Sequence, residues 1–123
     1  MPDDQDPRDY GPLKPDFFHI LLALSDQNRH GYGIIKAVEK VTEGRILLEP
    51  SPLYRRLKRL LEDGIVAEVE APANLDHDDE RRRYYGLTPL GHRVLAAEAS
   101  RLVALAESSK VRSLALSSGR ELQ

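Results

Sequence analysis

Four basic side chains lie close together in the segment SPLYRRLKRLLEDG, residues 51–64, and are the first candidates for chemistry in this sequence: Arg55, Arg56, Lys58 and Arg59. An arginine guanidinium can clamp a phosphate or read a guanine edge, and a lysine ammonium offers a point charge to a phosphate backbone. No acidic residue interrupts the segment between Ser51 and Leu61. The segment therefore indicates a local cationic surface that suits a polyanion such as DNA.

The same segment has the spacing of an amphipathic helix. At 100° per residue its leucines fall on one side and its basic residues on the other, so the helix would bury one face and expose a cationic one. Ser51 is a favourable N-cap, Pro52 suits the first helical position and Gly64 suits the end. The dry side is predicted to hold Leu53, Leu57, Leu60 and Leu61. The opposite side centres on Arg55 and Arg59, flanked by Lys58 and Arg56.

A second basic cluster, Arg81, Arg82 and Arg83, lies in a predicted β-hairpin. Its strands are residues 65–70, which alternate in polarity, and residues 83–87, which are rich in aromatics. A basic strand start after a long loop (71–82) suits a wing that lies along a phosphate backbone. Each cluster has an alternative, because the helix arginines could pair with Glu62, Asp63 or neighbouring carboxylates, and the wing arginines with the acidic loop residues. The two clusters together favour double-stranded DNA as the partner.

Composition limits the classes of protein that need to be considered. The chain has 123 residues, enough for one domain, and 18 Lys and Arg against 20 Asp and Glu, so the bulk charge gives no reason to expect a nucleic-acid or membrane partner. It has no cysteine, which removes disulfides and thiolate chemistry. The longest apolar stretch, residues 17–24, is shorter than the roughly 20 residues of a membrane span, and the first residues are acidic. We therefore expect a cytoplasmic protein with no membrane partner.

Catalytic and metal-binding patterns are weak in this sequence. The histidines, His19, His30, His77 and His92, do not fall into a ligand spacing, and no Gly-x-Ser-x-Gly or glycine-rich phosphate loop occurs. His77 with Asp76, Asp78 and Asp79 could hold a divalent cation, but a solvated acidic loop is the simpler interpretation. We expect no enzyme, no catalytic residue, no metal site and no cofactor.

The remaining elements define how these clusters would be positioned. Residues 1–15 hold four prolines and four aspartates and are predicted to form a flexible arm. A first helix should begin with Asp16 as its N-cap, and a second should follow His30-Gly31 and end near Gly44. Residues 45–49 suit one edge strand. Residues 16–88 would then be a winged helix-turn-helix domain, residues 89–116 one long C-terminal dimerisation helix that starts with Thr88-Pro89, and residues 117–123 a flexible tail. The fold class is mainly α with a small β-hairpin.

The predicted C-terminal helix carries an apolar stripe that a small domain cannot cover by itself: Leu95, Ala99, Leu102 and Ala106. A second copy of the chain would cover it, and two recognition helices about 34 to 36 Å apart could then enter successive major grooves. Phe17 in the first helix is a candidate for the core or for the same interface. The alternative is a helix that folds back on its own domain.

A series of short motifs resembles the PadR-like transcriptional regulators, in order and spacing. The match covers about residues 17–95. The motifs are His30-Gly31-Tyr32 with Ile35, then Pro50, Leu53-Tyr54, Leu57, Arg59, Leu60 and Asp63-Gly64, then Arg82-Arg83-Tyr84-Tyr85 with Leu87-Thr88-Pro89 and Gly91. The resemblance implies a homodimer, held by the terminal helix with help from the first helix, that binds a pseudo-palindromic operator and usually represses.

The resemblance also assigns residues by position. Tyr54, Arg55, Lys58 and Arg59 would be the recognition-helix contacts and Arg81 to Arg83 the wing contacts. Two departures bear on DNA binding. The family commonly has Gly-Thr where this chain has Ser51-Pro52, which affects a phosphate contact at the helix start, and the family's basic wing tip is here the acidic run 74–80.

The sequence therefore predicts a sequence-specific DNA-binding transcriptional regulator, a repressor that acts as a homodimer. Relatives often sense small aromatic or cationic compounds between subunits, so the resemblance includes release by a small-molecule effector, although nothing in this sequence identifies one. The alternative function is a winged-helix protein-interaction module whose basic face docks an acidic partner protein.

Overall fold

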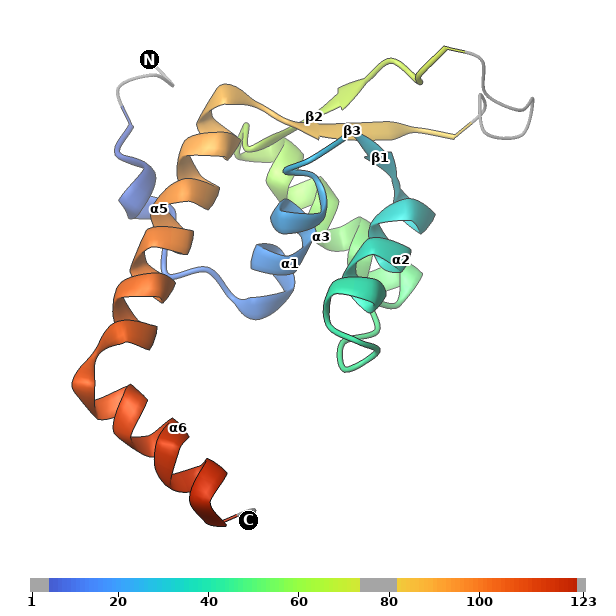
Figure 1. Cartoon of the computed structure of the whole chain (residues 1–123). Coiled ribbons are helices and arrows are strands. Elements are labelled where there is room, and N and C mark those ends of the chain that lie inside the picture. The colour runs from blue at the N-terminus through green and yellow to red at the C-terminus, as the bar shows by residue number, and fades with distance from the viewer. Residues whose placement is uncertain (1–4, 74–81, 122–123) are drawn as a thin grey trace.

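The computed structural model describes residues 5–73 and 82–121, and these are mainly helical with one small antiparallel sheet (Figure 1). The predicted mainly α fold class is confirmed. In chain order the elements are the 3₁₀ helix η2 (Pro7–Tyr10), α1 (Pro15–Ala23), β1 (Arg29–His30), α2 (Gly31–Val41), α3 (Pro50–Glu62), β2 (Val66–Val69), β3 (Tyr84–Leu87), α5 (Pro89–Glu107) and α6 (Ser109–Glu121).

The predicted hairpin forms, and a third strand joins it. β3 pairs with β2 from Val66 opposite Leu87 to Val69 opposite Tyr84, and its other edge pairs with β1, which gives the order β1-β3-β2. The prediction of an edge strand at residues 45–49 is wrong. That segment is a connection in which Leu48 is buried in the core. The Ile46 N–H donates to the Thr42 hydroxyl at 3.1 Å and the Glu49 carbonyl accepts from the Leu53 N–H at 3.0 Å, so these backbone groups are not available to a sheet edge.

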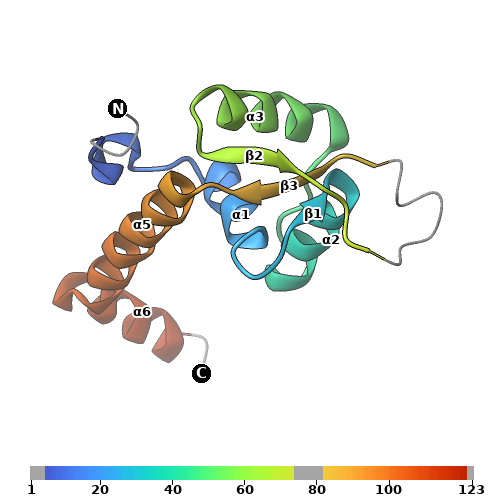
Figure 2. The same ribbon diagram turned by 90° about the horizontal axis from the view of Figure 1, so that it is seen from above.

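The core lies between the sheet and the first three helices. Figure 2 shows α3 running alongside β2, with α1 and α2 beneath the sheet. The largest side chains with less than 2% exposure come from all of these elements and from α5: Ile20, Leu21, Ile34, Val38, Leu53, Leu57, Val66 and Val94. α3 is therefore held along its leucine face, as its spacing predicted, while its opposite face is left for solvent or a partner.

Helix starts differ from the sequence expectation by one or two residues where prolines cluster. The N-cap of α3 is Glu49 rather than Ser51, because Pro50 occupies the first helical position. Pro52 is tolerated inside the first turn, where the backbone N–H groups have no intrahelical acceptor. In the same way Lys14 rather than Asp16 occupies the N-cap position of α1, without a side-chain capping hydrogen bond, and Pro15 is the first residue of the helix.

The start of α5 follows the prediction. The Thr88 hydroxyl accepts a hydrogen bond from the Gly91 N–H at 3.0 Å and lies 2.6 Å from the Gly64 carbonyl oxygen, to which it donates. Thr88 thereby caps α5 and ties its start to the end of α3. Gly91 allows this close approach, because a Cβ there would lie 2.0 Å from the carbonyl oxygen of Ile65.

The N-terminal residues are not the free arm that their composition predicts. Tyr10 and Leu13 pack against the core, and the Leu13 N–H donates a hydrogen bond of 2.8 Å to Oε2 of Glu98 on α5. Glu98 is 4% exposed and also accepts hydrogen bonds from the Arg101 guanidinium at 2.8 and 3.0 Å. These contacts fix residues 5–15 to the C-terminal part of the chain.

The C-terminal segment is two helices rather than one. Ser108 has an extended backbone (φ −63°, ψ 145°), and its hydroxyl donates to the Leu105 carbonyl oxygen at 2.7 Å. Serine competes for local backbone groups in this way, which favours a helix end. The expected flexible tail is also wrong over residues 117–121, since α6 continues to Glu121. α6 leads away from the rest of the molecule (Figure 1).

None of the described helices combines the length and the apolar composition that a bilayer crossing requires.

Candidate nucleic-acid interface

The outer face of α3 presents polar and basic side chains, as its spacing predicted. Leu53, Leu57 and Leu60 on the inner face are exposed by 2% or less. On the outer face Ser51, Arg55 and Lys58 are exposed, and Tyr54 keeps 51% of its surface accessible. The prediction that Leu61 belongs to the dry face is wrong, because Leu61 is 37% exposed and lies at the margin between the two faces.

Two of the four cations on α3 have carboxylate partners. Nη2 of Arg56 lies 3.0 Å from Oδ2 of Asp16 on α1, and its Nη1 donates to the Pro52 carbonyl oxygen at 3.2 Å. Nε of Arg59 donates to Oδ2 of Asp63 at 3.2 Å. Arg56 therefore joins α3 to α1, and Arg59 shares its charge with the acid at the end of its own helix. The alternative of internally paired arginines is correct for these two.

Arg55 and Lys58 differ from their neighbours. Within residues 5–73 and 82–121 neither of them has an ion-pair partner. Among the same residues the only hydrogen bond of the Arg55 side chain is the one its Nη1 donates to the Ser51 hydroxyl at 3.5 Å. Both side chains are exposed and lie on adjacent turns of the same face. The uncompensated positive charge of α3 is thus concentrated at these two positions.

Tyr54 connects this face to the start of α2. Its ring lies directly over Gly31, so that a Cβ at position 31 would come within 2.4 Å of the tyrosine hydroxyl oxygen. His30 caps α2, since its Nδ1 accepts the Gly33 N–H at 3.0 Å. The glycine after His30 therefore allows α2 and α3 to meet at Tyr54.

The base of the wing lies against the same helix start. The Arg82 guanidinium is 5.7 Å from the centre of the Tyr32 ring, and its Nη1 lies 3.3 Å from Nε2 of His30. The His30 and Tyr32 rings stack at a centroid distance of 6.4 Å. Arg83 is exposed and lies 4.0 Å from Glu68 on the facing strand. Arg81 and the acidic wing tip, residues 74–80, lie outside the described residues.

A small cleft of about 200 Å³ joins these parts of the surface, and its lining comes from α2, α3 and the wing: His30, Gly31, Tyr32, Tyr54, Arg82, Arg83 and Tyr85. Burial raises the pKa of the Tyr85 phenol, so this ring stays neutral at the base of the cleft. The structure thus places Tyr54, Arg82 and Arg83 together. His30 and Tyr32 were not singled out as site residues by their chemistry, and the His-Gly-Tyr sequence was their only signal.

The residues assigned to the dimer interface lie in different environments. Leu95 is 7% exposed in the core of its own chain, and Phe17 packs partly against that core. Ala99 and Leu102 are half-buried and Ala106 is exposed. Larger apolar side chains that follow on α5 and α6 are half or more exposed: Val103 (56%), Leu105 (50%), Leu114 (66%) and Leu116 (62%). The last two were missed because residues 109–121 were not recognised as a separate helix.

Among the described residues, no three His, Asp or Glu side chains gather in a group that could hold a metal ion. His77 and its neighbouring aspartates lie outside these residues.

Comparison with known proteins identifies relatives of this chain. The pattern of the transcriptional regulator PadR-like family matches residues 20–97. A 37.1 kDa protein of transposon Tn4556 from Streptomyces fradiae is 36% identical over 86 residues. The match takes in 70% of this chain but 22% of that protein, so the chain spans about a fifth of its relative's length.

Solved structures of regulators share the fold. A RosR-S4 complex structure, of the RosR protein of H. salinarum, is 19% identical with a TM-score of 0.65, over 97% of this chain and all of that one. PadR of Bacillus subtilis in complex with operator DNA is 20% identical with a TM-score of 0.56, over 68% of this chain and 46% of that one. A PadR-like transcription factor of Bacteroides fragilis is 25% identical with a TM-score of 0.58, over 74% and 82%. The winged-helix prediction is confirmed.

Proposed function

The chain belongs to the PadR-like family of transcriptional regulators, and from this premise we propose that it binds double-stranded operator DNA as a homodimer and represses transcription. α3 is the recognition helix in this proposal, and β2 and β3 with their loop form the wing. The PadR structure with operator DNA supports this assignment of parts, because its fold is shared by this chain.

The observation that carries the proposal is the exposed pair Arg55 and Lys58. An exposed cation without a carboxylate partner among the described residues is available to a phosphate or a guanine edge at no cost of breaking an ion pair. Arg56 and Arg59, the other two basic residues of α3, form ion pairs with Asp16 and Asp63 instead. The same short helix therefore separates its charges into a set that stabilises the fold and a set directed outward.

Further contacts extend from this pair on both sides. Tyr54 and Ser51 lie on the same exposed face, and Arg82 and Arg83 place two more cations at the wing base beside the start of α2. We assign these residues to phosphate and sugar contacts, which set orientation, and Arg55 to base reading. Arg59 contributes once DNA competes with Asp63 for its guanidinium, and Arg81 belongs to the same wing cluster.

We assign dimerisation to α5 and α6. Val103, Leu105, Leu114 and Leu116 on these helices together expose more apolar surface than a single chain usually leaves in contact with water. Ala99, Leu102 and Ala106 lie on α5 as well. A second copy would cover them and would place two α3 helices on one DNA molecule. Release by a small-molecule effector is the last part of the proposal, and it rests on the family resemblance.

Selection of bound fragments from a random pool of DNA duplexes tests this function. Because a twofold dimer reads two equivalent half-sites, the selected sequences should contain an inverted repeat with centres about 10 base pairs apart or a multiple of that. Recovery of fragments with no shared sequence would contradict a sequence-specific regulator. Recovery of single half-sites would contradict the dimer and leave DNA binding intact.

A further inference from the structure

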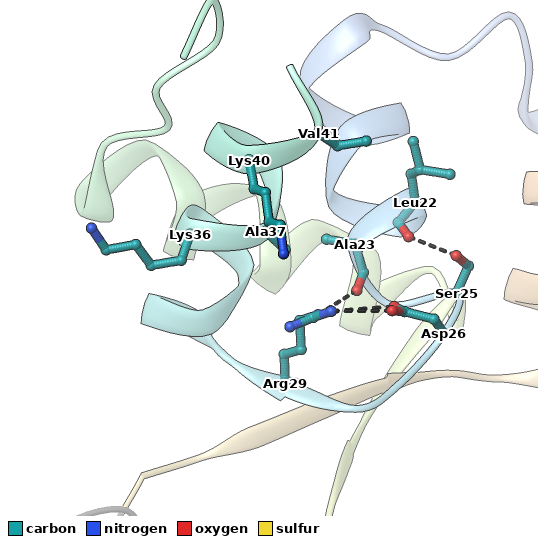
Figure 3. A pocket seen from close by; sticks show the side chains of 9 residues that line it. All are labelled: Leu22, Ala23, Ser25, Asp26, Arg29, Lys36, Ala37, Lys40 and Val41. Atoms are coloured by element: carbon teal, nitrogen blue, oxygen red, sulfur yellow. Dashed lines mark hydrogen bonds and ion pairs between the residues drawn. The ribbon is translucent and has the colours of Figure 1, made fainter. Parts of the chain in front are cut away.

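An open groove of about 720 Å³ lies between α1 and α2 (Figure 3). Its lining comes from the end of α1, the turn that follows, β1 and the second half of α2: Leu22, Ala23, Ser25, Asp26, Arg29, Lys36, Ala37, Lys40 and Val41. The groove shares no lining residue with the cleft between α2, α3 and the wing, although Lys36 at its edge stands over Tyr32, which lines that cleft. Its volume falls within the roughly 300 to 1,000 Å³ of small-molecule sites.

One part of the lining is apolar. Leu22 and Ala23 come from α1, and Ala37 and Val41 come from α2, so the two helices supply apolar carbon on both sides of the groove. Val41 keeps 61% of its surface exposed although it belongs to a helix whose other valine, Val38, is fully buried. Covering such a surface with an apolar group is favourable, by about 25 cal/mol per Å² removed from water.

The charges of the groove are mainly positive, with three cations against the single carboxylate of Asp26. Asp26 lies 3.2 Å from Nη2 of Arg29, whose Nε also donates to the Ala23 carbonyl oxygen at 2.7 Å. This ion pair holds the turn in place, and the charges of Asp26 and Arg29 largely cancel. The net positive charge of the groove therefore comes from the two lysines of α2.

The two lysines differ in their surroundings. Lys36 points outward in Figure 3, lies 3.8 Å from Glu39 and stands over the Tyr32 ring at 5.4 Å. The Lys40 side chain extends along Ala37 toward the hollow (Figure 3). In the part of the chain that the structure describes, Lys40 has no carboxylate within ion-pair distance. A positive charge thus stands beside an apolar surface inside a concave site.

We propose that this groove binds a small amphipathic organic anion, with the anionic group at Lys40 and the apolar body against Leu22, Ala37 and Val41. Charge complementarity favours an anion over a cation, and the apolar lining favours a molecule with a hydrocarbon body over inorganic phosphate or a DNA backbone. Such a ligand contacts α1 and α2 together. It therefore stabilises the packing of these two helices and the folded state as a whole.

Titration of the full chain with octanoate, followed by calorimetry and by amide NMR, tests the site without DNA. Saturable one-to-one binding should shift amide signals within residues 22–41, and octyltrimethylammonium, with the same chain and the opposite charge, should leave them unchanged. Lys40→Glu should weaken octanoate binding by about tenfold or more. Lys110→Glu, an exposed lysine on α6 with the same change of charge, should stay within about twofold of the wild type.

Three results would overturn the proposal. The first is no saturable binding of octanoate below its micelle-forming concentration. The second is binding that shifts residues of α5 and α6 and not residues 22–41, which would assign the ligand to the exposed apolar C-terminal face. The third is equal weakening by Lys40→Glu and Lys110→Glu, which would reduce the effect to net charge.

Val41→Ser, an exposed change that the fold should tolerate, should also weaken octanoate binding. Unchanged binding would contradict the assignment of Val41 to the apolar wall of the site.

Discussion

The backbone N–H of Leu13 donates a hydrogen bond of 2.8 Å to Oε2 of Glu98, a residue 85 positions further along the chain. The same carboxylate is held by the Arg101 guanidinium, and it is 4% exposed. A buried carboxylate is costly unless its oxygens are satisfied, and these partners satisfy them. Glu98 thereby fixes the N-terminal residues to α5, the helix to which we assign dimerisation.

Replacement of Glu98 by alanine should lower the free energy of unfolding by about 1 to 3 kcal/mol, because it leaves the Leu13 N–H without its partner. Urea denaturation measures this loss. Limited proteolysis should at the same time cut within residues 5–15 earlier than in the wild type. Glu107→Ala, at an exposed position of the same helix, is the control and should change stability by less than about 0.5 kcal/mol. Equal effects of the two variants would contradict the anchoring role of Glu98.

The same carboxylate should make stability depend on pH. Hydrogen bonding to Arg101 lowers the pKa of Glu98 below its ordinary value of 4.5 despite its burial, and the Leu13 amide acts in the same direction. A lowered pKa in the folded state means that the stabilisation is complete above the ordinary value and is lost as the pH falls below it. The stability difference between the wild type and Glu98→Gln should therefore be largest near pH 7 and shrink below pH 4.5. A gap that widens on acidification would contradict this assignment.

Gly91→Ala should destabilise the protein although alanine favours helices. The added Cβ would stand 2.0 Å from the Ile65 carbonyl oxygen, so α5 must move away from the end of α3. Overpacking of this kind costs about 1 to 3 kcal/mol, and thermal unfolding should show it as a lower midpoint. Ser100→Ala, at an exposed site on α5, should be close to neutral. An unchanged midpoint for Gly91→Ala would show that the helix start adjusts freely.

Arg55 and Arg56 are sequence neighbours with different expected roles. Arg55→Ala should weaken operator binding by about 1 to 3 kcal/mol and relax base preference at one position, with unfolding unchanged within about 0.5 kcal/mol. Arg56→Ala should leave the base preference of the protein unchanged. It should lower the free energy of unfolding by up to about 1 kcal/mol, because it removes the ion pair with Asp16. Anisotropy with labelled duplex and urea denaturation separate the two. The reverse pattern would assign the wrong arginine to DNA.

Some of this structure could be predicted because its signals are local. The Thr88-Pro89 start of α5 and the leucine face of α3 depend on residues within a few positions of each other, and the structure has both. The connection at residues 45–49 was predicted wrongly as a strand because its short apolar run fits a strand or a buried loop equally well. Leu48 uses its apolar side chain to enter the core instead.

The long-range contacts could not be predicted in this way. Glu98 lies next to Ala99 of the predicted apolar stripe, and nothing in the sequence identifies Leu13 as its partner. The difference between Arg56 and Arg55 has the same origin, since Arg56 pairs with Asp16 on another helix while Arg55 has no carboxylate partner in the part of the chain that the structure describes. Which cations remain available to DNA is therefore a property of the fold.

We assign Arg55 and Lys58, which have no carboxylate partner within residues 5–73 and 82–121, to DNA contacts, and Lys58 to the phosphate backbone. The salt dependence of DNA binding tests this assignment most directly. Fluorescence anisotropy with a selected duplex should show that the logarithm of affinity falls linearly with the logarithm of salt concentration, by several units per log unit. Lys58→Ala should reduce this slope by about 1. Affinity that does not change with salt, or no binding even in dilute buffer, would contradict the account, as would a slope that Lys58→Ala leaves unchanged.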